Sequence, residues 1–147
     1  MADFKLVVSD PKSGKAYNVD VTGPKINKFV GKPIGSEIEG ESAGLNGYTL
    51  VITGGSDKDG VPMRRDLPGQ PRRKVLVANG TGYHAKSEGM RKRKLLRGNE
   101  ISSDLVQINA KVTAYGAQTL DEIIPKVEKP KAEGTRQATT GKNKFKK

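Results

Sequence analysis

The residues of this chain whose types and spacing best fit a chemical task are lysines and arginines in one internal segment. Residues 64–98 contain 11 Lys and Arg against two acids, Asp66 and Glu88. Arginine forks and lysine ammonium groups bind phosphate oxygens, and glycines between them let the backbone approach a nucleic acid closely. A block of this kind repels itself unless a polyanion or the solvent screens it. The segment therefore predicts contacts to nucleic-acid phosphates.

The candidate RNA-binding residues are the cations of this block. They are Arg64, Arg65, Arg72, Arg73, Lys74, Lys86, Arg91, Lys92, Arg93, Lys94 and Arg97. Tyr83 is the only aromatic residue within 64–98, so stacking on bases is poorly supplied and binding should depend on phosphate, sugar and shape. A nuclear-import peptide at 91–94 would leave the rest of the block unexplained. The few apolar anchors predict that the block is partly mobile without RNA.

A glycine-rich acidic segment, 54–60, is a candidate metal or phosphate loop because it holds Asp57 and Asp59. Aligning Gly60 with the glycine of a calcium loop puts Gly55 where the first acidic ligand belongs. No Gly-Lys pair has the upstream glycine of a Walker loop. The segment is predicted to be a tight turn after a strand, with carboxylates that cap backbone N–H groups. The alternative, a metal-dependent enzyme acting on nucleic acid, has too few ligands here.

The remaining titratable residues do not form a recognisable catalytic pattern. His84 is the only histidine, and beside a basic block it is expected to contact phosphate or solvent. Glu37 and Glu39 would share one face of a strand, where solvated surface is a better explanation than acid–base catalysis. The sequence therefore predicts no enzyme activity, no cofactor, no metal site and no small-molecule substrate.

The other basic segment is the end of the chain. Residues 126–147 carry eight Lys and Arg against Glu128 and Glu133, with few apolar residues, and predict a flexible basic tail. The net charge is +11, and the chain has no cysteine, no apolar leader and no run of about 20 apolar residues. These features predict a soluble intracellular protein with no membrane partner.

Short strands must position the basic block. Apolar and polar residues alternate over 4–8 and 17–21, on either side of turn residues at 10–14, which predicts a hairpin. Apolar runs at 48–53 and 75–78 predict buried strands, and 105–112 has the clearest alternation in the chain. Frequent Gly and Pro over 22–47 exclude a long helix there.

One short helix is predicted near residue 120. Thr119 and Glu122 have the spacing of a capping box before Ile123, and Pro125 ends the helix. The fold class predicted is mostly β: a small antiparallel β-barrel with a short C-terminal helix and basic extensions. The predicted domain organisation is one β-barrel-like domain over 1–125, which contains the basic block at 64–98, followed by the tail.

Several segments resemble the small-subunit ribosomal protein six-e family. The sequence Ile-Thr-Gly-Gly-Ser-Asp-Lys-Asp-Gly-Val-Pro-Met at 52–63 is similar to the diagnostic pattern of that family. Segments 34–40, 90–99 and 106–109 resemble other parts of the family in the same order. The motif residues of the turn are Gly54, Gly55, Asp57, Gly60, Pro62 and Met63. The resemblance covers roughly residues 1–115 and is closest to a short, archaeal-like form.

The resemblance implies a structural constituent of the small ribosomal subunit, located on the cytoplasmic ribosome, that acts in subunit assembly and translation. Its partners would be small-subunit ribosomal RNA and neighbouring ribosomal proteins, and it would have no catalytic activity. The phosphorylated serines of eukaryotic members are not implied, because residues 126–147 contain no serine. The motif loop, 54–63, would set the direction in which the basic block leaves the barrel. The charge pattern alone also allows a DNA-binding architectural protein.

Overall fold

The fold was obtained as a computed structural model, which describes residues 4–124. Its strands are β1 (Phe4–Ser9), β2 (Ala16–Val21), β3 (Glu37–Glu39), β4 (Thr49–Asp57), β5 (Arg72–Val77), β6 (Lys92–Arg97) and β7 (Leu105–Ala114). Two 3-10 helices, η1 (Gly23–Lys28) and η2 (Gly40–Ala43), and one short helix, α1 (Leu120–Ile123), complete it. The prediction of a mostly β fold with a short C-terminal helix is confirmed.

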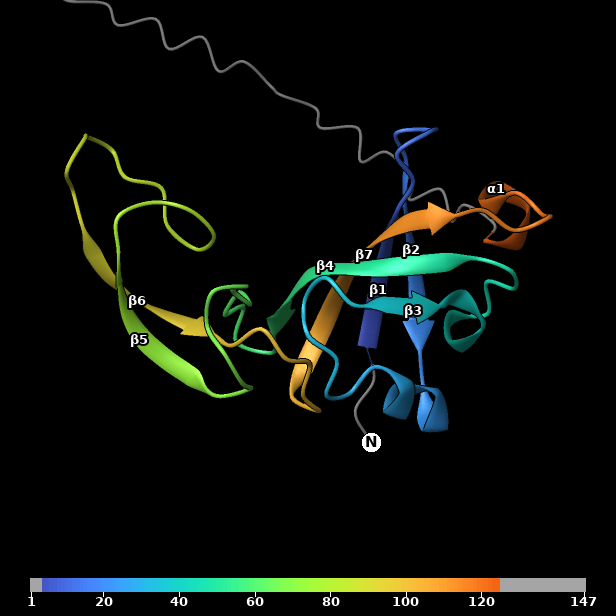
Figure 1. Cartoon of the computed structure of the whole chain (residues 1–147), viewed down its shortest axis with the longest axis horizontal. Helices are drawn as coiled ribbons and strands as arrows, with labels where there is room; N and C mark the ends of the chain where they lie inside the picture. Colours follow the sequence, from blue (N-terminus) through green and yellow to red (C-terminus); the bar gives the residue numbers. More distant parts are fainter. Residues whose placement is uncertain (1–3, 125–147) are drawn as a thin grey trace, which may run out of the picture.

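Five strands form one curled sheet in the order β2-β1-β7-β4-β3, and the curl makes a half-barrel (Figure 1). Pairings between neighbours are antiparallel, as predicted, except that β1 and β7 run parallel. The predicted 17–21 strand pairs with β1 through the turn at 10–14, so the hairpin is confirmed. The direction in which β1 pairs with β7 could not be predicted from the sequence. Almost the whole described chain separates the two strands, so no tight turn requires them to be antiparallel.

The core lies on the inner face of the half-barrel. Leu6, Leu50, Ile52, Ile108 and Val112 are buried there, on strands whose intervening side chains face outward. This alternation is the reason that β1 and β7 were predictable, since a strand with one buried face places every second side chain in the core.

The β5–β6 hairpin is separate from the five-stranded sheet. Apart from one bridge between Met63 and Arg97, its strands pair only with each other, and the hairpin projects from the end of the half-barrel opposite α1 (Figure 1). Two backbone hydrogen bonds hold its base: the Arg64 N–H donates to the Arg97 carbonyl at 3.0 Å, and the Arg97 N–H donates to the Pro62 carbonyl at 3.0 Å. The basic block is therefore a folded ribbon in this structure.

The turn between β1 and β2 is organised by Asp10. Its carboxylate accepts hydrogen bonds from the Tyr115 hydroxyl at 2.6 Å, the Ser13 hydroxyl at 2.7 Å and the Lys12 N–H at 2.9 Å. These bonds, with that of Tyr115 the strongest, favour the charged carboxylate and lower its pKa from 3.8 to about 2. Asp10 thus joins the predicted turn to the end of β7.

Replacing Tyr115 by phenylalanine should raise the pKa of Asp10 toward its ordinary value, because the strongest hydrogen bond to the carboxylate is removed. Titration of the Asp10 carboxyl carbon by NMR would measure it. The wild-type group should contribute stability above about pH 4 and lose that contribution as the pH falls through about 2, because the folded pKa is the lower one. An Asp10 pKa that is the same in both proteins would contradict the assignment.

The C-terminal part of the described chain is the short helix. The Thr119 N–H donates to the Glu122 carboxylate at 3.3 Å, which is one half of the predicted capping box. The predicted tail, 126–147, lies outside the described residues. Within 4–124, no helix is long and apolar enough to cross a membrane.

Candidate nucleic-acid interface

The glycine-rich motif begins inside a strand and not after it. The strand predicted over 48–53 continues as β4 to Asp57, through Gly54 and Gly55, and pairs with β7 along that length. The pairing is irregular between Ile52 and Gly54, so the strand passes the glycines as a β-bulge. The predicted tight turn follows, where the Gly60 N–H donates to the Asp57 carbonyl at 2.9 Å.

Asp57 is the centre of a buried network of charges. Its side chain is fully buried and accepts hydrogen bonds from Arg97, which is also buried, and from the Arg72 Nε–H at 2.7 Å. Arg97 also donates to the Ser102 hydroxyl and to Asp104 at 3.1 Å. The predicted capping of backbone N–H groups is present too, because the Lys58 N–H donates to Asp57 at 2.6 Å.

Electrostatics keep the Asp57 carboxylate charged. Burial on its own would raise the pKa of Asp57, but hydrogen bonds from Arg72 and the Lys58 N–H, and the charge of Arg97, outweigh it and hold the pKa below 3.8. The network links the end of β4 with the bases of β5 and β6. Asp57 of β4 thus binds one arginine from each strand of the hairpin, Arg72 and Arg97, and this attaches the hairpin to the half-barrel.

The network also changes how the acidic loop should be interpreted. Arg72 binds Asp59 at 2.6 Å as well as Asp57, so both carboxylates considered as metal ligands have a guanidinium partner. No group of three or more His, Cys, Asp or Glu side chains within 4–124 is arranged to hold a metal ion. The geometry assigns these two acids to holding the hairpin in place.

The structure divides the 11 predicted RNA-binding cations into two groups. Arg64, Arg72 and Arg97 form ion pairs with acids of the chain, and the Arg97 side chain is only 5% exposed. We therefore leave these three out of the proposed interface. The other eight form no ion pair with any described residue. These eight, here named the hairpin cations, are Arg65, Arg73, Lys74, Lys86, Arg91, Lys92, Arg93 and Lys94.

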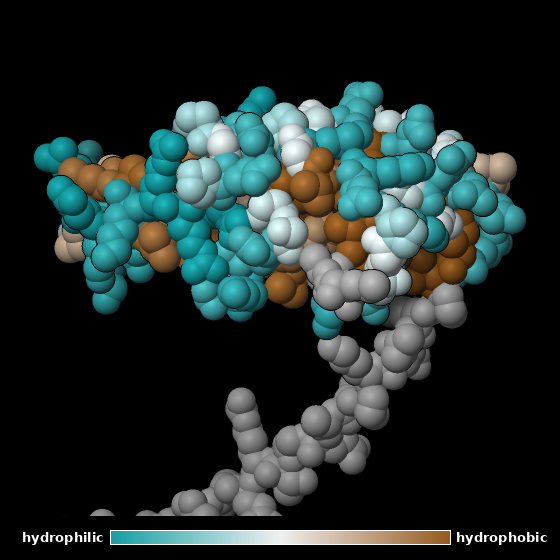
Figure 2. Space-filling view, turned by 90° about the horizontal axis from the view of Figure 1, so that it is seen from below, coloured by the Kyte–Doolittle hydropathy of each residue, from teal (hydrophilic) through white to brown (hydrophobic). Residues whose placement is uncertain are grey.

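Seven of the hairpin cations lie on the two faces of the β5–β6 ribbon or on its loop, and Arg65 lies on the segment that leads to β5. Cross-strand partners share a face, so the pairing of Lys74 with Leu95 and of Leu76 with Arg93 places two cations and two leucines together. Leu76 is 54% exposed and Leu95 is 39% exposed. Figure 2 shows the same mixture of hydrophilic and hydrophobic residues at the hairpin end of the molecule. This surface carries a positive field and is not buried against the half-barrel.

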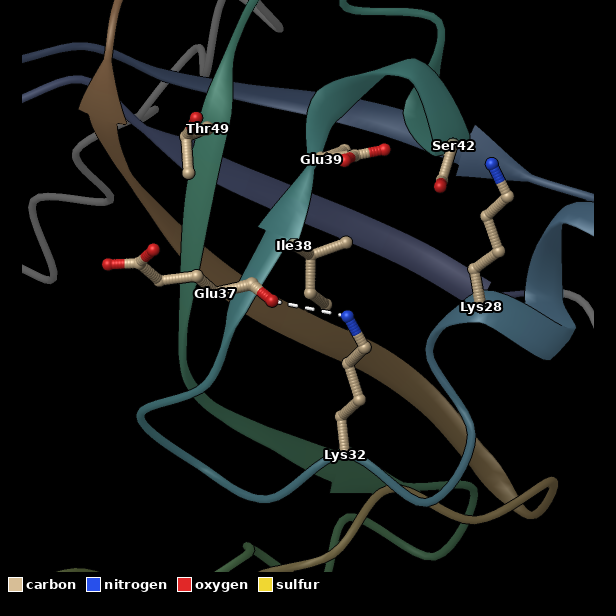
Figure 3. Close-up of a pocket in the computed structure, with 7 residues that line it drawn as sticks. All are labelled: Lys28, Lys32, Glu37, Ile38, Glu39, Ser42 and Thr49. Carbon is tan, nitrogen blue, oxygen red and sulfur yellow. Dashed lines mark hydrogen bonds between the residues drawn. The ribbon is translucent and has the colours of Figure 1, made fainter.

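The remaining sequence candidates lie apart from the network. His84 is exposed on the loop between β5 and β6. Glu37 and Glu39 flank the buried Ile38 on β3, and their carboxylates point in different directions beside a pocket (Figure 3). Lys28 and Lys32 line the same pocket, and Lys32 donates to the Glu37 carbonyl at 3.1 Å. Its two cations are matched by two acids, so this pocket does not extend the positive surface.

Sequence reasoning missed the ion pair between Asp57 and Arg97 and the strand β6. The two residues are 40 positions apart, and no local pattern connects them. β6 reads Lys-Arg-Lys-Leu-Leu-Arg, without the alternation that marks a half-buried strand. No local signal marks β6, because its leucines, Leu95 and Leu96, pair with Lys74 and Arg73 and not with the apolar run at 75–78.

Comparisons with known proteins identify the family of the chain. The sequence model of the family Ribosomal protein S6e matches residues 4–125. A protein of Methanocella arvoryzae named Small ribosomal subunit protein eS6 is 73% identical over 129 residues, which is 88% of this chain and 91% of the relative. Proteins with the same name are 54% identical in Methanoculleus marisnigri (87% of this chain, 97% of the relative) and 43% identical in Haloarcula marismortui (84% and 96%). The chain therefore belongs to the Ribosomal protein S6e family.

Proposed function

We propose that this chain is a structural component of the small ribosomal subunit that binds ribosomal RNA through the hairpin cations and acts in subunit assembly and translation. The observation that carries the proposal is the group of eight cations without acidic partners among the described residues, seven on the ribbon or its loop and Arg65 on the segment that leads to it. The buried network holds this ribbon in place at the end of the half-barrel. Membership of the ribosomal family supports it. The role has no catalytic step, and its place is the cytoplasmic ribosome.

The mechanism is electrostatic. Each cation that meets a phosphate releases a condensed counterion, so affinity should fall with salt, and each contact contributes about 0.7–0.9 to the slope of log affinity against log salt. A preformed ribbon has already lost much of its conformational entropy, so less free energy is spent on ordering it when RNA binds. Neighbouring ribosomal proteins would cover the exposed leucines, and residues 126–147 would add further cations.

Sedimentation of native extract tests the proposed location. The chain should move with small subunits through a sucrose gradient and stay with them after a high-salt wash, because many contacts act together. Release at modest salt, or absence from that peak, would contradict a ribosomal role.

Competition between polymers separates this role from that of a DNA-binding architectural protein. A two-stranded ribbon with basic side chains also suits the major groove of DNA, so this alternative has a geometric basis. Structured small-subunit RNA should compete for the chain more strongly than duplex DNA of equal charge at the same salt concentration. Equal or stronger competition by the duplex would favour the DNA-binding role.

A further inference from the structure

A second surface beside the hairpin has the properties of a ligand pocket. It has a volume of about 520 Å³, within the range of roughly 300–1,000 Å³ that small organic ligands occupy. Its floor is the outer face of β4 and β7, where Gly54 lies opposite Asn109 and Ser56 lies opposite Gln107. Residues of the segment that leads to the hairpin and of the hairpin loop form its walls.

The floor presents a fixed pair of amides. The Gln107 side-chain NH₂ donates to the Asn109 side-chain carbonyl at 2.8 Å. This bond holds the two amides side by side and leaves the Gln107 Oε1 atom as an acceptor and the Asn109 Nδ2 atom as a donor. Neither atom has a hydrogen-bond partner among residues 4–124. A neighbouring donor and acceptor match the edge of a nucleobase, which offers the complementary pair.

Gly54 keeps the floor open, and the fold itself does not require a glycine there. Its φ is not positive, and a Cβ added to it would meet nothing within 4 Å. At Gly55, by contrast, a Cβ would lie 2.6 Å from the Gln107 carbonyl oxygen, so packing demands a glycine. Glycine weakens a strand interior, and it is found there at bulges, such as the one between Ile52 and Gly54, and where a ligand approaches the backbone closely.

The wall of the pocket supplies positive charge. Arg65 is exposed, forms no ion pair with the described residues, and places its Nη2 atom 3.9 Å from the position that a Cβ on Gly35 would occupy. Thr81, from the hairpin loop, also lines the pocket. Among the described residues that line this pocket there is no Asp or Glu. The pocket therefore combines amides for a base with a guanidinium for a phosphate.

We propose that this pocket holds one unstacked ribonucleotide of the bound RNA, with its base edge on Gln107 and Asn109 and its phosphate on Arg65. The proposal rests on the proposed RNA-binding function and adds a specific contact to it. Bases that leave the helical stack are the ones that proteins read by hydrogen bonds to their edges. The hairpin cations would hold the RNA backbone, and the pocket would fix the register of the protein on it.

Equilibrium binding of the full chain to an in vitro transcript of small-subunit ribosomal RNA tests the pocket. Gly54→Ala and Asn109→Ala should each weaken affinity about three- to tenfold, the range that one or two lost neutral hydrogen bonds would produce. The slope of log affinity against log salt should stay unchanged, because neither substitution removes a phosphate contact. Gly54→Ala should unfold at the same temperature as the wild type or higher, since the added methyl group meets no atom.

Asn18→Ala is the matched control. Asn18 is exposed on β2 and pairs with Val7, and Val7 pairs with Asn109 on its other side. Asn18 therefore lies on the same outer face of the sheet as Asn109 but does not line the pocket. Its substitution should leave RNA affinity unchanged. If Gly54→Ala and Asn109→Ala bind RNA with wild-type affinity and salt dependence, the pocket does not hold a nucleotide, and the proposed RNA-binding function still stands. Weaker retention on small subunits at unchanged RNA affinity would mean that a protein occupies it. Failure of the wild type to prefer the transcript over unrelated RNA would overturn both.

Discussion

Replacing Asp57 by asparagine is expected to lower the free energy of unfolding by about 3–5 kcal/mol, the loss typical when one partner of a buried ion pair is removed. Asparagine has nearly the same shape but no charge, so Arg97 would keep a buried guanidinium without its closest counterion. Urea denaturation followed by circular dichroism measures the effect. The hairpin should also lose its fixed attachment, and hydrogen exchange at the backbone amides of Arg64 and Arg97 should become faster.

Asp104→Asn is the control for that experiment. Asp104 binds the same arginine at 3.1 Å, but its side chain is 62% exposed, so its loss should lower the free energy of unfolding by less than about 1 kcal/mol. The pKa of Asp57 is lowered in the fold, so its contribution is present at neutral pH and disappears as the pH falls through the folded pKa, below 3.8. Asp57→Asn should lack that acid-dependent loss. Similar effects of the two substitutions would show that burial of the network contributes little to stability.

Removal of three hairpin cations should have the largest effect on RNA binding. Replacing Arg73, Lys74 and Arg93 together by glutamine is expected to lower the slope of log affinity against log salt by about 2–3, and affinity by at least about tenfold at moderate salt. These side chains are exposed on the ribbon, so the fold should keep its melting temperature. Filter binding of small-subunit RNA over a series of KCl concentrations measures both quantities.

An equal change of charge elsewhere separates contact from net charge. Lys12, Lys25 and Lys28 are exposed on the half-barrel, and their joint replacement by glutamine removes the same three charges. That variant should keep the salt slope within about 0.5 of the wild type, since no phosphate contact is lost. If the two triple variants weaken binding equally, the affinity depends on the net positive charge of the chain, and the prediction of direct phosphate contacts by the hairpin cations is wrong.

The parts of this fold that the sequence revealed are those with local patterns. The strands β1, β2 and β7 follow from alternation, and the position of α1 follows from Thr119 and Glu122, because each signal lies within a few residues of what it specifies. The path of β4 through Gly54 and Gly55 did not follow, since glycine usually ends a strand and only contact with β7 continues it here. The count of basic residues also included Arg97, whose burial depends on an acid far away in the chain.

For the candidate site, composition identified the basic segment. It did not show which of its Lys and Arg residues form ion pairs within the chain and which are exposed. Lys and Arg residues look alike in a charge count, whether they face solvent or an internal acid. Arg72 and Arg73 are adjacent, yet one is bound to Asp57 and the other is exposed. Their side chains point to opposite faces of β5, and only the fold shows which face meets the carboxylate.

The parallel pairing of β1 with β7 has a consequence for the order of events during synthesis. During translation β1 and β2 emerge first. The second edge of β1 stays unpaired until β7 emerges, and β7 is the last of the strands to be synthesised. The strands of the β5–β6 ribbon pair with no other strand and are complete before β7 emerges. The ribbon that carries the proposed RNA-binding cations can therefore form while the half-barrel is still open, and the last strand to arrive completes the five-stranded sheet.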